Sequence, residues 1–197
     1  LGIDETEMGW AMSAFFWAYA LAQVPAGWLG NCYGPRAMLA IYATLWSLIC
    51  AAFYFVGGIL SLIALQAGFG IAQAGIFPCS AGMIRHWVPA TRWALAVGLM
   101  GGFMSVGGAL GSAITGYAIE GISTDWLTTA AVRWQWVFVA FALPGLPFAA
   151  WFYLWFRNQP EEHDGANAAE CELVRRSSPE QPVTSSGTSW IATAVQW

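Results

Sequence analysis

The chain has little charge and contains no lysine. Only 9% of its 197 residues are charged, whereas soluble domains carry about 25%. No Asp, Glu, Lys or Arg occurs in the 48 residues between Arg36 and Arg85, and residues 8–35, 93–119 and 134–156 are also free of charge. A helix that crosses a bilayer needs about 20 mostly apolar residues. The shortage of charge therefore excludes a water-soluble domain and predicts an all-α, polytopic bundle of transmembrane helices in a lipid bilayer.

Other absences exclude whole classes of function. There is no basic stripe along the chain, so nucleic acid is not expected as a partner. The sequence shows no paired carboxylates, no Ser/His/Asp set and no phosphate-binding loop, and both histidines fall outside the apolar runs, so an enzyme embedded in the membrane has no support. No metal, redox site or cofactor is expected, because the four cysteines are far apart and form no Cys/His cluster. These cysteines are Cys32, Cys50, Cys79 and Cys171.

The apolar runs predict five spans within a membrane bundle over residues 1–157. We expect residues 158–197 to form a polar cytoplasmic linker. Up to residue 187 it is rich in Ser, Pro and Glu and is expected to be disordered, and at 190–197 it turns apolar again. The predicted spans are residues 8–30, 37–56, 60–84, 93–119 and 134–156.

The arginines predict the orientation of these spans. Arg36 lies between the first two spans, Arg85 and Arg92 between the third and fourth, and Arg157 after the fifth, whereas Arg133 falls on the opposite side. Short basic loops stay in the cytoplasm. We therefore expect an integral protein of the plasma (inner) membrane with its N-terminus outside and its tail inside. An outside start with an odd number of spans also suggests that one helix precedes this chain.

Few polar side chains lie within the predicted spans. Tyr19 and Gln23 are four residues apart and share one helix face, and Gln66 and Gln73 are seven apart and share another. Polar groups at this depth face the bundle interior or a watery cavity, because lipid cannot satisfy them. The four side chains are thus candidates for the lining of a solute cavity. Hydrogen bonding between helices is the alternative.

Glycine is concentrated in the fourth span. Gly98 and Gly102, and likewise Gly107 and Gly111, are spaced so that another helix can approach closely. This spacing does not distinguish static packing from a sliding contact. Kinks or breaks are expected at the prolines near or within spans, which are Pro25, Pro78, Pro144 and Pro147.

Several local motifs are more specific than the composition. The run MGWAMSAFFWAYALAQVPAGWL occupies residues 8–29, and GWLGNCYGPR occupies residues 27–36. The first resembles the second helix of the major facilitator superfamily, and most closely that of its anion:cation symporter branch. The second is similar to the superfamily loop motif Gly-x-Leu-x-Asp-x-x-Gly-x-Arg. The resemblance covers residues 1–165. It extends to GIAQAGIFP at 70–78, WVPATR at 87–92, WQWVF at 134–138 and RNQPEEH at 157–163.

The resemblance implies that the five spans correspond to helices two to six of a twelve-helix fold. The missing first helix and the C-terminal half of the same transporter would then be partners of this chain. It further implies a secondary transporter that moves a small polar or anionic organic solute, such as a sugar acid or another carboxylate, by alternating access. Arg36 and Asn31 would act in a cytoplasmic gate, with Gly27 and Gly34 shaping the turn.

The chain departs from the branch at positions that matter for coupling. An Arg and a Glu usually stand seven apart on the fourth helix, and the aligned residues here are Gln66 and Gln73. Glutamine exchanges no proton near neutral pH, which argues against proton symport through these helices, although protons and sodium both stay open as coupling ions. Asn31 and Thr91 replace two loop acids, and Met104 stands where some members have Gln. The alternative to a transporter is a truncated fragment that only packs in the membrane.

Overall fold

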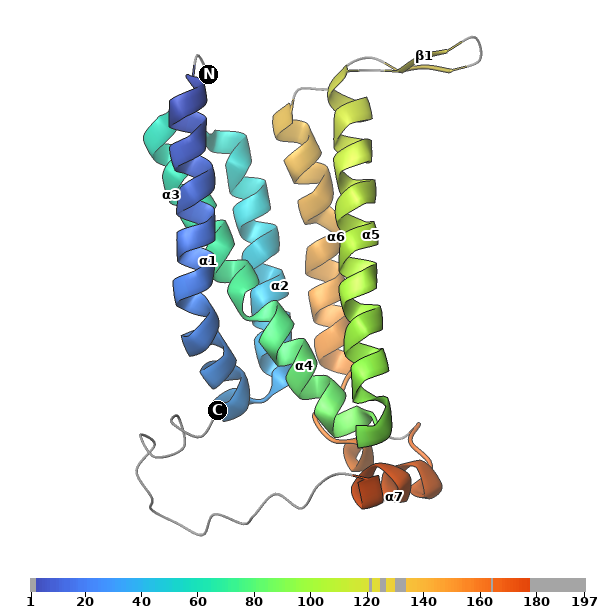
Figure 1. The fold of residues 1–197 in the computed structure, drawn as a ribbon. Helices are drawn as coiled ribbons and strands as arrows, with labels where there is room; N and C mark the ends of the chain where they lie inside the picture. Colours follow the sequence, from blue (N-terminus) through green and yellow to red (C-terminus); the bar gives the residue numbers. More distant parts are fainter. Residues whose placement is uncertain (1–2, 121, 125–126, 130–133, 164, 178–197) are drawn as a thin grey trace.

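The computed structural model describes residues 3–120, 122–124, 127–129, 134–163 and 165–177. Arg133 and the apolar end at 190–197 lie outside these residues. In the described part, long helices stand side by side, and a short hairpin of two antiparallel three-residue strands follows α5 (Figure 1). The elements are α1 (Glu5–Tyr33), α2 (Pro35–Ala52), the 3-10 turn η1 (Phe53–Phe55), α3 (Ile59–Ala74), α4 (Ile76–Trp87), η2 (Ala90–Arg92), α5 (Trp93–Glu120), β1 (Ile122–Thr124), β2 (Leu127–Thr129), α6 (Trp134–Trp155), η3 (Pro160–Glu162) and α7 (Ala168–Ser177).

This architecture confirms the predicted all-α membrane bundle. By length and composition, four segments can cross a membrane: Pro35–Phe55, Ile59–Trp87, Ala90–Glu120 and Trp134–Trp155. Helix α1 has 29 residues but is not among the four, because Trp, Tyr, Gln and Pro dilute its apolar residues. Its role as a fifth span stays a prediction.

Helices α1 and α3 pack most closely at a glycine. A Cβ at Gly70 would fall on the carbonyl oxygen of Phe15 and 3.0 Å from the backbone nitrogen of Tyr19. Phe15 and Phe69 pack beside this crossing with their ring centroids 5.9 Å apart. The two backbones can approach so closely because Gly70 has no side chain.

The third predicted span is broken at Gly75. Pro78 has no N–H to bond the carbonyl of Ala74 and its ring crowds that carbonyl, so α3 ends at Ala74 and α4 begins at Ile76. The ring of Tyr42 from α2 lies against Gly75 where a Cβ would otherwise be. The other span prolines do not break helices: Pro25 lies inside α1, and Pro144 and Pro147 lie inside α6.

The glycines of α5 differ from the sequence prediction. Among the described residues, no atom lies within 4 Å of a Cβ built at Gly98, Gly102, Gly107 or Gly111, and α5 has no buried residue. The close helix approach predicted for these pairs therefore does not occur within this part of the chain. The close approach is made instead between α2 and α6, where a Cβ at Gly145 would fall on Oγ of the buried Ser47.

The polar linker contains a helix where disorder was predicted. At the start of α7, Asn167 Oδ1 accepts a hydrogen bond from the N–H of Ala169 (3.2 Å), and Glu170 accepts one from the N–H of Asn167 (3.1 Å). One turn later, the Glu172 carboxylate pairs with Arg175 and Arg176. A capped first turn and i,i+3 and i,i+4 ion pairs stabilise a short helix, so residues 168–177 are ordered although their composition is polar.

Candidate functional site

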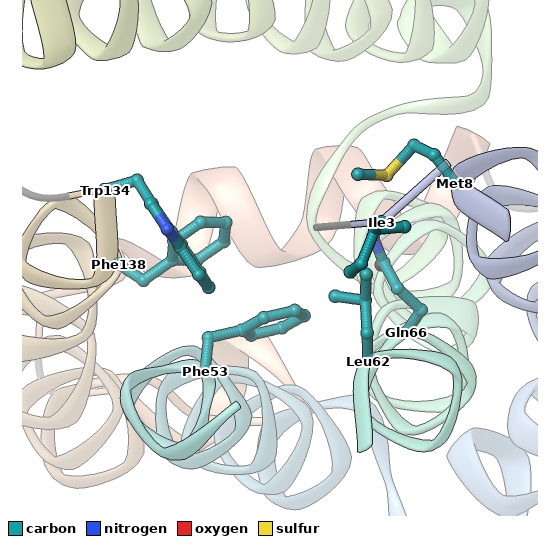
Figure 2. Close-up of a pocket in the computed structure, with 7 residues that line it drawn as sticks. All are labelled: Ile3, Met8, Phe53, Leu62, Gln66, Trp134 and Phe138. Carbon is teal, nitrogen blue, oxygen red and sulfur yellow. The ribbon is translucent and has the colours of Figure 1, made fainter. Parts of the chain in front are cut away.

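A cavity of about 470 Å³ opens at the end of the bundle where the chain begins (Figure 2). Phe53, Trp134 and Phe138 form one side of it, and Gln66 on α3 contributes the only side-chain amide among its described lining residues. Phe53 and Phe138 stack with their ring centroids 4.7 Å apart. The cavity therefore combines aromatic faces with two side chains that can donate hydrogen bonds, the Gln66 amide and the Trp134 indole.

The other three cavity candidates do not line this space. Tyr19 is half-buried, stacks on Phe15 with centroids 6.1 Å apart, and packs against the cluster that contains Tyr42 and Ala74. Gln23 and Gln73 are half-buried on α1 and α3. Because the α1–α3 crossing at Gly70 lies between Gln66 and Gln73 in the sequence, the two glutamines sit on either side of the closest contact.

Within the described residues, the amides of Gln23, Gln66 and Gln73 and the hydroxyl of Tyr19 form no hydrogen bond with one another. Hydrogen bonding between helices was the alternative explanation for these polar side chains. These amides and this hydroxyl do not supply such bonds here, so they keep their capacity to donate to a ligand.

A second cavity, of about 460 Å³, lies at the opposite end of the bundle. We call it the polar crevice. It brings together three of the four gate-motif residues, Gly27, Asn31 and Gly34. Its described lining residues are Gly27, Gly30, Asn31, Gly34, Pro35, Pro78, Cys79, Gly82, Arg85, His86, Asn158 and Gln159.

Arg36, the fourth gate-motif residue, binds α6 and the segment after it. Its Nε donates to the carbonyl oxygen of Tyr153 (2.7 Å), and its guanidinium lies 4.5 Å from the centroid of the Tyr153 ring. Its backbone N–H donates to Asn158 Oδ1 (3.0 Å). Helix α2 has no side-chain cap of its own, so Asn158 satisfies one of the free N–H groups at its start.

The two gate glycines have different roles. Gly34 has a φ of 84°, in the left-handed region, and a Cβ there would lie 2.7 Å from Asn158 Nδ2, so it shapes the turn between α1 and α2 as predicted. Gly27 lies within α1, away from the turn, and a Cβ there would lie 3.4 Å from Pro78 Cβ. The prediction that Gly27 shapes the turn is therefore wrong: this residue lies inside α1, where a Cβ would make an ordinary van der Waals contact with Pro78 of α4.

Sequence reasoning missed Asn158 and Tyr153. Both lie more than a hundred residues from Arg36, so no local spacing connects them to it. The motif at 157–163 was recognised as the exit from the last helix, but nothing in one sequence pairs it with the turn at residue 34.

The decisive comparison is with protein-family models, since the model of the Major Facilitator Superfamily matches residues 1–195. The chain belongs to the major facilitator superfamily. This family consists of transporters, so the chain is an integral, multi-pass membrane protein and not an enzyme.

Curated members of the superfamily resemble the chain over most of its length. It is 32% identical over 176 residues to a D-galactonate transporter of Escherichia coli, covering 88% of this chain and 38% of the relative. It is 24% identical over 191 residues to a probable sulfoacetate transporter of Cupriavidus necator, covering 96% and 42%. A putative tartrate transporter of Agrobacterium vitis is 30% identical over 162 residues, with 82% and 36% covered. The chain spans about two fifths of the length of the first two relatives.

Proposed function

We propose that these helices act as the N-terminal half of a secondary transporter that carries a small organic anion, of the sugar-acid or carboxylate type, by alternating access. The superfamily match supports the mechanism, because its two halves rock around a site near the middle of the membrane. The printed names of the relatives, which include galactonate and tartrate transporters, support the class of solute.

The observation that carries this proposal is the position of Gln66. Its amide faces an aromatic-lined cavity and has no hydrogen-bond partner among the described residues. An amide N–H can donate to a carboxylate or hydroxyl oxygen, and the aromatic rings can cover the C–H face of the solute. In this proposal Tyr19, Gln23 and Gln73 extend the solute path along the α1–α3 contact.

The same residues bear on coupling. Neither Gln66 nor Gln73 exchanges a proton near neutral pH, so we propose that no proton is carried on α3 and that any coupling ion binds elsewhere. Imposing a pH gradient on reconstituted protein tests this point. Uphill, proton-driven uptake that is lost when Gln73 is replaced would contradict it.

We further propose that α1 is a fifth span, with its N-terminus outside and the tail in the cytoplasm. Figure 1 shows α1 running beside the neighbouring helices from one end of the bundle to the other. The crevice end of the bundle carries Arg36, Arg85, Arg92 and Arg157, and basic loops remain cytoplasmic. Asn31, Gly34 and Arg36 would then act in the cytoplasmic gate.

The test compares two variants on one helix in the reconstituted full reading frame. Gln66→Leu removes the amide, whereas Ala64→Leu, at an exposed position two residues earlier, adds the same side chain outside the cavity. If Gln66 donates to the bound anion, Gln66→Leu should weaken D-galactonate binding about tenfold, since a hydrogen bond to a charged group contributes about 1.5–3 kcal/mol. Ala64→Leu should bind as the parent does.

Equal binding by parent and Gln66→Leu would remove Gln66 from the solute site. The same full reading frame also tests the other candidate, a non-transporting fragment. If the full reading frame binds and exchanges no organic anion under conditions in which it is folded, the fragment interpretation replaces the transporter.

A further inference from the structure

The polar crevice has open space within it. A Cβ at Gly82, which lines the crevice from α4, would meet no atom within 4 Å, whereas a Cβ at Gly30 would lie 2.6 Å from Cys79 Sγ. The wall is therefore tightly packed beside Gly30 and free beside Gly82. A volume of about 460 Å³ can accept a group much larger than a water molecule, which occupies about 30 Å³.

The charge of the crevice is not balanced. Arg85 and His86 line it, and no Asp or Glu is among its described lining residues. Both side chains are exposed, and neither forms an ion pair within residues 3–120, 134–163 and 165–177. Because a guanidinium is always protonated in proteins, Arg85 presents a permanent positive charge to the crevice.

Neutral hydrogen-bond donors accompany this charge. Asn31, Asn158 and Gln159 each place an amide in the lining. The oxygen of Asn158 already accepts the N–H of Arg36, so its Nδ2 group is the end that can donate to a ligand. A fixed cation together with amide donors suits an anion with several oxygen atoms.

Aromatic residues place the crevice at the depth of lipid headgroups. Trp28 and Tyr33 are 56% and 68% exposed beside the end of α1, and Trp87, directly after His86, donates its indole N–H to the carbonyl of Arg157 (3.1 Å). Trp and Tyr gather at this level in membrane proteins. Basic pockets between transmembrane helices bind anionic lipid headgroups.

We propose that the polar crevice binds a phosphate group, with Arg85 as the cation and the Asn158 amide as a donor. A membrane phospholipid or a free phosphate compound could supply this group, and the depth of the crevice favours the lipid. The proposal goes beyond the solute site and does not rest on it, because the crevice is separate from the cavity that contains Gln66; it shares Asn31 and Gly34 with the proposed cytoplasmic gate.

The experiment measures the binding of short-chain phosphatidylglycerol and of inorganic phosphate to the purified chain in detergent by native mass spectrometry. Arg85→Gln removes the cation. Gly82→Leu fills the space and leaves every charge in place. The matched controls are Arg92→Gln, which removes an exposed arginine outside the crevice, and Gly9→Leu, which adds a side chain at an open position of α1. Unfolding is followed for every variant.

Arg85→Gln should weaken phosphatidylglycerol binding at least tenfold, as expected for the loss of one charge-assisted contact. Gly82→Leu should weaken it because the leucine side chain occupies the space of the phosphate, and both controls should bind as the parent does. If inorganic phosphate displaces the lipid and shows the same sensitivity to the variants, a free phosphate compound is the ligand. If phosphate does not compete, the lipid is the ligand. Equal binding of both probes by the parent, Arg85→Gln and Gly82→Leu would overturn the proposal.

Lipid binding and solute binding can fail separately. Gln66→Leu should leave phosphatidylglycerol binding unchanged, and Gly82→Leu should leave D-galactonate binding unchanged in the full reading frame. Arg85→Gln and Gly82→Leu are read side by side, because one keeps the shape of the crevice and the other keeps its charge.

Discussion

Replacing Gly75 by alanine should destabilise the bundle, because the ring of Tyr42 occupies the space that a Cβ would need. A Cβ at this position would lie well inside 3.0 Å of three ring atoms of Tyr42. The ring cannot easily retreat, since Tyr42 is only 5% exposed and its hydroxyl donates to the carbonyl of Ala26 (3.3 Å). The backbone itself tolerates alanine, because Gly75 has a φ of −86°.

The expected cost is about 2 kcal/mol. Overpacking a core costs about 1–3 kcal/mol, and displacing the Tyr42 hydroxyl from its acceptor adds roughly 1 kcal/mol. Alanine returns up to about 1 kcal/mol by reducing the conformational freedom of the unfolded chain, since the backbone at Gly75 accepts it. The free energy of unfolding of Gly75→Ala should therefore fall clearly, whereas Gly9→Ala, at an open position of α1, should be neutral or slightly stabilising.

A double-mutant cycle identifies the cause. The chain contains 13 tryptophans, so its equilibrium unfolding in mixed micelles of dodecyl sulfate and a mild detergent can be followed by fluorescence. In a Tyr42→Ala background the space is vacant, and Gly75→Ala should then cost nothing. If Gly75→Ala is as stable as the parent, or if its cost is the same with and without the Tyr42 ring, the packing argument is refuted.

Three further predictions concern other contacts of the bundle. Gly108→Leu should leave the unfolding midpoint of this chain unchanged, because a Cβ at Gly108 meets no described atom of another helix. Gly145→Leu should separate α2 from α6 and lower the midpoint. Equal midpoints for the two variants would contradict this prediction. Asn158→Ala should lower the free energy of unfolding by about 1 kcal/mol in the same titration, which is the usual contribution of a helix cap. An unchanged midpoint would show that Asn158 does not stabilise α2 as a cap. The guanidinium groups of Arg176 and Arg175 hold the pKa of the Glu172 carboxyl below its ordinary value, so the ion pairs stabilise α7 at neutral pH and are lost as the pH falls through that lowered pKa. A spin label on Cys171 should report α7 loosening in acid for the parent, and Glu172→Gln should abolish this pH dependence; identical titrations would rule the ion pairs out.

The general architecture could be predicted from the sequence because the bilayer imposes it. Long runs without charge can be stable only as helices in lipid, and the runs at 93–119 and 134–156 correspond to α5, Trp93–Glu120, and α6, Trp134–Trp155. The positive φ of Gly34 was also predictable, since a turn this tight between two helices needs glycine.

Other features depend on contacts that one sequence does not show. A helix break precedes Pro78 and none precedes Pro144, because the proline effect depends on the surrounding packing, here the Tyr42 ring against Gly75. The order of α7 was missed because a disorder prediction weighs composition, whereas a few local bonds from Asn167 and Glu172 stabilise that helix. For the site, the spacing of Gln66 and Gln73 predicted a shared face, but it could not show that, of the two, Gln66 alone lines the cavity beside Phe53, Trp134 and Phe138.

The interruption at Gly75 has a mechanical consequence. A continuous rod would transmit any tilt from one membrane surface to the other, whereas a joint in the middle lets each segment respond to its own surroundings. We therefore expect residues before the joint, such as Gln66, and residues after it, such as Gly82 and Arg85, to be less strongly coupled in bending than they would be on one continuous helix. Paired substitutions on opposite sides of the joint should consequently change the free energy of unfolding by the sum of their separate effects, and the two ends of this span can be engineered independently.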